Sequence, residues 1–168
     1  YKEGGIYLDS DVELLRSFDD LLHLPYFIGE EQGGNIEPAI IGCEKGWDFL
    51  ERMLSYYENR HFVVNGNMDM QTLPAIMSQE INRHYEYKKV RTPKEFEVDS
   101  DKFCVLPAEY FSPKYPNGFK CPITSNTYCV HHFAASWYPV DKKAFRMIRK
   151  LFGYKTAHLM SVLIKGRK

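Results

Sequence analysis

The chain of 168 residues lacks several features that would assign it to a common class of protein. No apolar run approaches the ~18 residues that a membrane-spanning helix needs. The 22 basic residues match 22 acidic ones, which gives no electrostatic reason to expect nucleic-acid binding. The four cysteines form no C-x-x-C pair, which argues against a zinc or redox motif. The chain also has no N-x-S/T sequon, so we expect a cytoplasmic rather than a secreted protein.

The balanced charge hides an asymmetry along the chain. Residues 1–60 carry thirteen acids and five bases, whereas residues from 141 onward carry nine bases and one acid. An acidic N-terminal segment suits a cation site, and a basic C-terminal segment suits the binding of a phosphate group or an anionic membrane surface. The periodicity predicts a basic amphipathic helix over 140–153. Peripheral contact with the inner face of a membrane is one interpretation of it, and a solvated helix face is the other.

Short apolar runs alternate with amphipathic segments, which predicts a single α/β domain. Residues 6–8 are expected to form a buried strand, and 107–127 an ordered loop. Helices are predicted over 46–59 and 72–84. Further strands are predicted at 26–29, 39–42, 87–91, 103–106 and 128–132.

Two carboxylates directly follow the first predicted strand. Ligands of open α/β sheets bind beyond the carboxyl ends of strands, and alternation along an extended chain would point Asp9 and Asp11 the same way. Hard carboxylate oxygens suit Mg²⁺ or Mn²⁺. A cation that bridges a diphosphate would neutralise the charge that develops on a leaving nucleotide. The alternative interpretation is an Asx-turn with solvated carboxylates.

A second informative stretch, residues 123–137, contains two adjacent histidines. Neutral imidazole is a common metal ligand. Side chains of neighbouring strand residues point to opposite faces, so only one of His131 and His132 can reach a given site. The indole N–H of Trp137 is a donor suited to a phosphate oxygen. A structural histidine and a core tryptophan are the alternatives.

Both stretches carry a resemblance to a known family. Residues 4–13, G-G-I-Y-L-D-S-D-V-E, resemble the D-x-D segment of glycosyltransferase family 32, which includes capsular-polysaccharide glycosyltransferases and fungal initiating mannosyltransferases. Residues 126–137 resemble the N-T-Y-x-x-H-H-x-x-x-S-W ending of its bacterial members. The resemblance implies a GT-A fold, a nucleotide-sugar donor, Mn²⁺ or Mg²⁺, and retention of anomeric configuration. It also implies transfer of a hexose to a glycan, polysaccharide or glycolipid acceptor.

The resemblance also implies residue roles. Asp9 and Asp11 become the catalytic pair, in which Asp11 binds the metal directly and Asp9 contacts the ribose and sugar of the donor. His131 becomes the other metal or diphosphate contact. Glu37 stands where many relatives carry Asn or a small polar residue, and we expect it to be a solvated acid. The remaining predicted donor-binding residues are Tyr7, Ser136 and Trp137.

The family carries a nucleotide-binding half before its D-x-D segment, and residues 1–5 read as the last turn of a helix with a glycine cap. We therefore expect residues 1–168 to be the C-terminal portion of one GT-A catalytic domain, a mixed sheet flanked by helices that is inactive alone. Two alternatives stay open. One is a haloacid-dehalogenase-type phosphatase with Asp9 as nucleophile, and the other is a non-catalytic nucleotide- or sugar-binding remnant.

Overall fold

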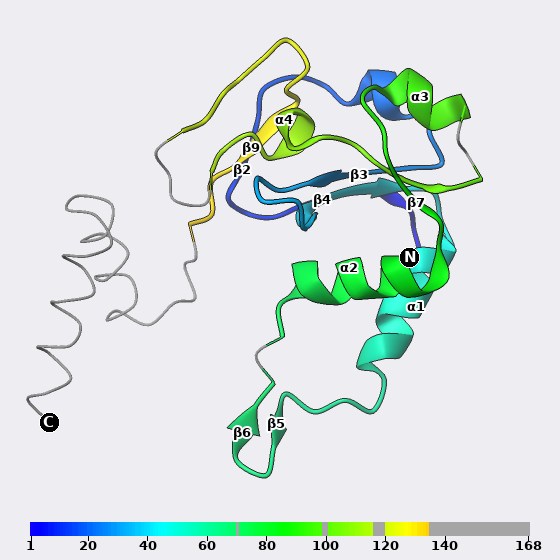
Figure 1. Ribbon diagram of the computed structural model, residues 1–168, viewed down its shortest axis with the longest axis vertical. Helices are drawn as coiled ribbons and strands as arrows, with labels where there is room; N and C mark the ends of the chain where they lie inside the picture. The colour runs from blue at the N-terminus through cyan, green and yellow to red at the C-terminus, as the bar shows by residue number, and fades with distance from the viewer. Residues whose placement is uncertain (70, 99–100, 116–119, 135–168) are drawn as a thin grey trace, which may run out of the picture.

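The computed structural model describes residues 1–69, 71–98, 101–115 and 120–134 (Figure 1). Ser136, Trp137 and the helix predicted over 140–153 lie outside these residues. The described part is a mixed α/β structure, as predicted. Its assignment to the GT-A fold stays a prediction.

The centre of the molecule is an antiparallel sheet with the order β1-β4-β3. Its strands are β1 (Gly5–Leu8), β3 (Tyr26–Glu30) and β4 (Ile36–Cys43). A parallel bridge between Gly29 and Leu106 joins β3 to the chain that follows β8 (Phe103–Val105). Strand β8 in turn pairs in parallel with β7 (Tyr87–Lys89). Antiparallel and parallel pairing thus combine in one mixed arrangement.

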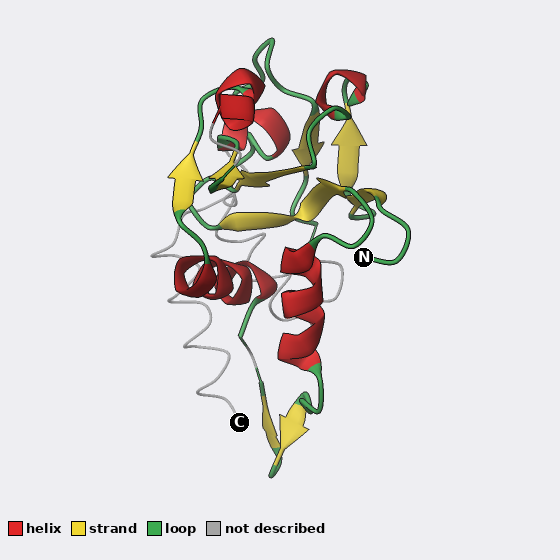
Figure 2. Ribbon diagram, turned by 90° about the vertical axis from the view of Figure 1, so that its right-hand side faces the viewer, coloured by secondary structure: helices red, strands yellow, loops and turns green. Residues whose placement is uncertain are grey.

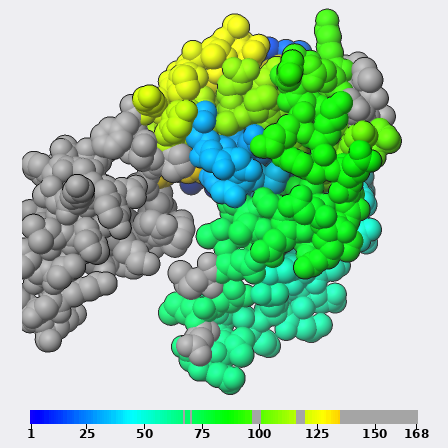
Figure 3. Space-filling view, in the orientation of Figure 1, coloured from blue at the N-terminus to red at the C-terminus, as the bar shows by residue number. Residues whose placement is uncertain are grey.

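Helices lie on both sides of this arrangement (Figures 1 and 2). On one side are α1 (Asp48–Tyr57) and α2 (Leu73–His84), and on the other are α3 (Pro93–Val98) and α4 (Ala108–Phe111). In the space-filling view, α1 and α2 form the lower part of the molecule together with the hairpin β5 (Val63–Val64) and β6 (Asn67–Met68) (Figure 3). Within the described residues, the helices predicted over 46–59 and 72–84 and the predicted strands occur close to their expected positions.

An aromatic core holds the layers together. The rings of Phe27 and Phe111 lie 5.7 Å apart, which packs α4 against β3, and Phe49 of α1 lies 4.8 Å from Phe103 of β8. Helix α4 interrupts the predicted loop 107–127, which was therefore wrong over this turn. Pro107 begins the turn with φ near −61°, a value that its ring favours, and Phe111 is buried at its end. The turn thus gains its stability from core contacts.

Strand β1 differs from the prediction in its burial. Residues 6–8 do form a strand, but Ile6 is 39% exposed and Tyr7 is 56% exposed. The reason is that β1 pairs with β4 alone within the described part of the chain. It therefore lies at a sheet edge, where a side chain has fewer neighbours.

Among the described residues, no helix combines the length and the apolar composition that a membrane span requires.

Candidate functional site

The two predicted carboxylates lie where β1 ends. The backbone N–H of Asp9 donates to the carbonyl of Ala39 on β4 at 2.9 Å, which fixes the end of the strand. The chain then makes a turn, closed by a 3.1 Å hydrogen bond from the Val12 N–H to the Asp9 carbonyl, and enters β2 (Val12–Leu14). The expected extended geometry of Asp9 and Asp11 was therefore wrong. A D-S-D sequence favours a turn because its side chains hydrogen-bond to nearby backbone.

Strand pairing brings the second predicted stretch to this turn. Strand β9 (Cys129–His131) pairs antiparallel with β2, and His131 stands opposite Val12, the residue that follows Asp11. The backbone N–H of His132 also donates to the Asp11 carbonyl at 3.0 Å. This register places two segments that are distant in the sequence at one end of β1.

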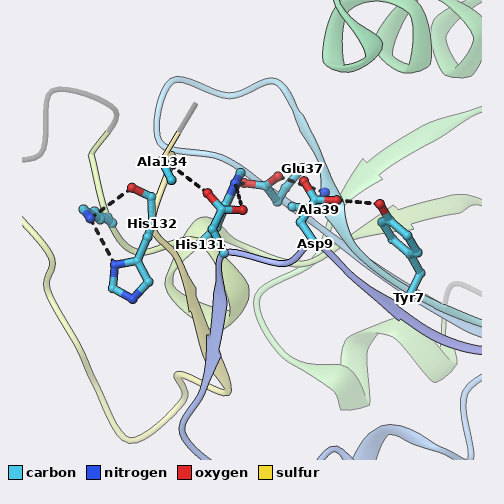
Figure 4. Close-up of polar contacts among 9 residues, drawn as sticks. Tyr7, Asp9, Glu37, Ala39, His131, His132 and Ala134 are labelled. Atoms are coloured by element: carbon cyan, nitrogen blue, oxygen red, sulfur yellow. Dashed lines mark hydrogen bonds and ion pairs between the residues drawn. The ribbon is translucent and has the colours of Figure 1, made fainter. Parts of the chain in front are cut away.

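The two histidines point in opposite directions, as predicted (Figure 4). The Nε2 atom of His131 lies 3.5 Å from Oδ1 of Asp11. The Nε2 atom of His132 instead lies 2.8 Å from Oε2 of Glu13, and its Nδ1 lies 3.1 Å from Nζ of Lys114. Of the two imidazoles, the one from His131 therefore faces the D-x-D turn.

Three side chains converge at this point with the chemistry of a cation site. One possible ligand atom from each of Asp9, Asp11 and His131 lies within 4.8 Å of the others, and all three residues are half-buried. Two carboxylates and one imidazole fit a divalent cation that accepts oxygen and nitrogen, which suits Mn²⁺ better than the oxygen-seeking Mg²⁺. Three protein ligands would leave coordination positions for phosphate oxygens. Metal binding itself stays a prediction.

Glu37 joins this cluster from inside the sheet. We expected a solvated acid, and this was wrong because Glu37 is only 1% exposed. Its Oε2 lies 3.0 Å from Nδ1 of His131, and its Oε1 accepts the Ala39 N–H at 3.0 Å. The position of Glu37 in an otherwise apolar strand was a signal in the sequence that this acid is buried. A buried charge needs a partner, which predicts a donor or cationic group nearby.

The carboxylates around His131 also set its protonation. Burial alone lowers the pKa of this imidazole. The hydrogen bond and charge of Glu37, together with the charges of Asp11 and Asp9, outweigh burial, so the pKa of His131 lies above its ordinary value. Without a metal, a proton on the ring therefore stabilises the cluster of acids.

Tyr7 lies beside the carboxylates and not in the core. Its hydroxyl donates a 2.6 Å hydrogen bond to Oδ1 of Asp9. That hydrogen bond is the largest of the effects that raise the pKa of the Tyr7 phenol, ahead of burial and the charge of Asp9. Tyr7 is 56% exposed and is therefore not a core side chain. A role in donor binding stays a prediction.

Asp11 also anchors the chain that leaves β9. Its Oδ2 accepts the backbone N–H of Ala134 at 2.7 Å, across 123 residues of sequence. Its other carboxylate oxygen, Oδ1, is the one that faces His131. One side chain thus contributes to the cluster and holds the start of the segment that leads to Ser136 and Trp137, which the structure does not describe.

Comparison with known proteins gives one partial likeness. The chain is 44% identical over 50 residues to inositol phosphoceramide mannosyltransferase 3 of Schizosaccharomyces pombe. This match covers 30% of the chain and 14% of the relative, so the chain matches only a small part of that protein's length. No protein-family model and no solved structure matches the chain.

Proposed function

We propose that this chain forms part of a metal-dependent glycosyltransferase that moves a hexose from a nucleotide sugar to a glycan, polysaccharide or glycolipid acceptor. The observation that carries the proposal is the convergence of Asp9, Asp11 and His131 at the end of β1. The partial likeness to a mannosyltransferase supports sugar transfer at the coarse level. Retention of configuration and a role in capsular-polysaccharide synthesis belong to the same proposal.

Each side chain has a definite task in this proposal. Carboxylate oxygens of Asp9 and Asp11 and Nε2 of His131 would hold a divalent cation, which would supply positive charge to the diphosphate of the leaving nucleotide. Tyr7 orients Asp9 by donating its hydroxyl hydrogen. Asp11 at the same time accepts the Ala134 N–H through Oδ2, which holds the chain at the end of β9 beside the D-x-D turn.

The neighbours of Asp9 favour this proposal over the phosphatase alternative. A haloacid-dehalogenase-type reaction uses the first aspartate as a nucleophile and gives no role to an imidazole that faces the second. Here His131 faces Asp11 and is held from behind by Glu37. A cation site accounts for this histidine and for both aspartates together.

Mn²⁺ titration and a sugar-transfer screen test the proposal together. Calorimetry would compare the wild-type chain with Asp11→Asn, in which the amide oxygen still accepts the Ala134 N–H while one charge is lost. Glu13→Gln is the matched control because it makes the same chemical change at an acid that faces His132. We expect Asp11→Asn to weaken Mn²⁺ binding by at least roughly tenfold, about 1.4 kcal/mol, and the control to leave it unchanged.

The transfer screen separates enzyme from binding remnant. It would offer UDP- and GDP-linked hexoses with Mn²⁺ to the whole protein of which this chain forms part, and follow release of the nucleotide. Metal-dependent release that falls about 100-fold or more in Asp11→Asn is the expected result for an active enzyme. Binding of nucleotide and Mn²⁺ without release would favour the non-catalytic remnant. Equal Mn²⁺ affinity in wild type and Asp11→Asn would overturn the metal site.

A further inference from the structure

A buried carboxylate stands directly behind the candidate metal ligand. Glu37 lies on the central strand β4 and is 1% exposed, and both of its carboxylate oxygens have partners. Burial of a charged group is costly unless hydrogen bonds and an opposite charge compensate for it. A side chain kept under these conditions is held in one orientation, and here that orientation is toward His131 (Figure 4).

The contact with Glu37 favours one of the two ring nitrogens of His131 as the carrier of the proton. A carboxylate only accepts hydrogen bonds, so the contact from Glu37 Oε2 requires a hydrogen on Nδ1. In the neutral ring Nε2 then keeps its lone pair, and this is the atom that faces Oδ1 of Asp11 at 3.5 Å. In this neutral form, the imidazole presents a free electron pair on the side of the two aspartates.

The backbone of β4 ties the same groups into one unit. The N–H of Ala39 donates to Oε1 of Glu37, and the carbonyl of Ala39 accepts from the N–H of Asp9. One residue of the central strand thus fixes both the carboxylate behind His131 and the start of the D-x-D turn. The distance between the imidazole and the aspartates is set by a strand of the sheet and not by a loop alone.

We propose that Glu37 is a positioning residue that holds His131 in the Nδ1–H tautomer, with Nε2 aimed at a divalent cation shared with Asp9 and Asp11. The proposal rests on the proposed function, because it assigns Glu37 a role at that same metal. Carboxylates that hold metal-bound histidines in this way typically contribute 10–100-fold to metal affinity. Glu37 itself touches neither the cation nor the substrate.

The variant Glu37→Gln separates this role from simple filling of space. The amide has the same shape, but it offers one acceptor oxygen and one NH₂ group. The Ala39 N–H needs the oxygen, so the NH₂ group must face Nδ1 of His131. Nδ1 then becomes the acceptor and Nε2 carries the hydrogen, which removes the lone pair from the side of the aspartates.

The test follows bound Mn²⁺ by calorimetry and by pulsed electron paramagnetic resonance, which detects the ¹⁴N coupling of a metal-bound imidazole. We expect the coupling in wild type, and its loss in His131→Ala and in Glu37→Gln. Glu37→Gln should also lower Mn²⁺ affinity by about 10–100-fold. The matched control is Glu13→Gln, which changes the other Glu–His pair and should alter neither quantity.

Four results would contradict the proposal in distinguishable ways. If Glu37→Gln keeps both affinity and ¹⁴N coupling, or loses affinity while the coupling remains, Glu37 has no positioning role and the metal site stands. If wild type binds no Mn²⁺, the proposed function fails and this proposal with it. If the variant does not fold, ¹H–¹⁵N spectra of neutral His131 in metal-free wild type decide: a hydrogen on Nδ1 supports the proposal, and one on Nε2 overturns it.

Discussion

Replacement of Gly42 by alanine tests the packing that supports the site. Gly42 lies on β4, directly opposite Phe27 of β3. A Cβ atom at this position would lie 2.1 Å from Cζ of the Phe27 ring, far inside van der Waals contact. The ring cannot easily move away, because Phe27 is 2% exposed and packs against Phe18 at 5.5 Å and Phe111 at 5.7 Å. Gly42→Ala must therefore displace core side chains or the strand itself.

The expected cost follows from measured effects of overpacking. An extra methyl group in a filled core destabilises a protein by about 1–3 kcal/mol. In a domain of this size about 1 kcal/mol corresponds to roughly 2–4 °C in Tm. Calorimetry of Gly42→Ala should thus show a Tm lower by roughly 2–12 °C, and urea unfolding should show a free energy of unfolding lower by about 1–3 kcal/mol. Mn²⁺ affinity of the folded variant should not change, because Gly42 lies at the other end of β4 from Glu37.

A double-mutant cycle makes this prediction specific to one contact. Phe27→Leu shortens the side chain that meets the new methyl group, at the cost of a cavity. We expect the two substitutions together to cost less than the sum of their separate costs, by about 0.5–3 kcal/mol. If Gly42→Ala is neutral, or if the two substitutions are strictly additive, the new methyl group does not clash with the Phe27 ring.

Four further predictions concern the site and its supports. Tyr128→Phe removes a 2.8 Å hydrogen bond to Asp20 and should destabilise the chain by about 1 kcal/mol in urea unfolding; no loss would mean that this bond makes no net contribution. Burial is the main cause of the raised pKa of the half-buried Glu31 carboxyl. The protonated carboxyl therefore stabilises the folded state below the usual glutamate pKa, and this contribution is lost as pH rises through the pKa of Glu31 in the folded state. Glu31→Gln should therefore be more stable than wild type at about pH 8 and lose this advantage at about pH 4; a gain independent of pH would contradict it. Tyr7→Phe frees the Asp9 carboxylate and should weaken Mn²⁺ binding by about tenfold in calorimetry, and unchanged binding would show that the phenol does not orient Asp9. Mn²⁺ at about 100 times its Kd should raise the free energy of unfolding by about 2.7 kcal/mol, an effect that EDTA must reverse.

The regular elements of the fold could be predicted from local patterns, because apolar residues at helical or strand spacing need only their neighbours along the chain. Burial of β1 could not, since it depends on which strands lie beside it. The hairpin of β5 and β6 also has a local signal. Asn65-Gly66 separates two short strands, and both residues have positive φ, 51° and 78°. An Asn-Gly pair favours this hairpin turn, and the sequence therefore contained the prediction of β5 and β6.

The meeting of Asp11 and His131 was expected from family resemblance and not from local pattern. The contact depends on the register of β2 with β9, and a slip of one residue would turn His131 to the opposite face. Local reasoning also assigned an extended geometry to the D-x-D segment, whereas the observed turn brings its carboxylates together. A turn at this place follows from the residue types, but its direction follows from the Asp9–Ala39 hydrogen bond to β4.

Glu37 shows most clearly where reasoning from sequence ends. An isolated acid is assigned to solvent because its burial without a partner is too costly. The partner here is His131, which is 94 residues away along the chain, so no local window contains both. The neighbours of Glu37 nevertheless limit the choices, since Ile36 and Ala39 are buried on the same strand. An acid in such a strand lies either at the boundary between core and solvent or beside a cationic or donor group inside the core. Only the tertiary structure distinguishes these two cases.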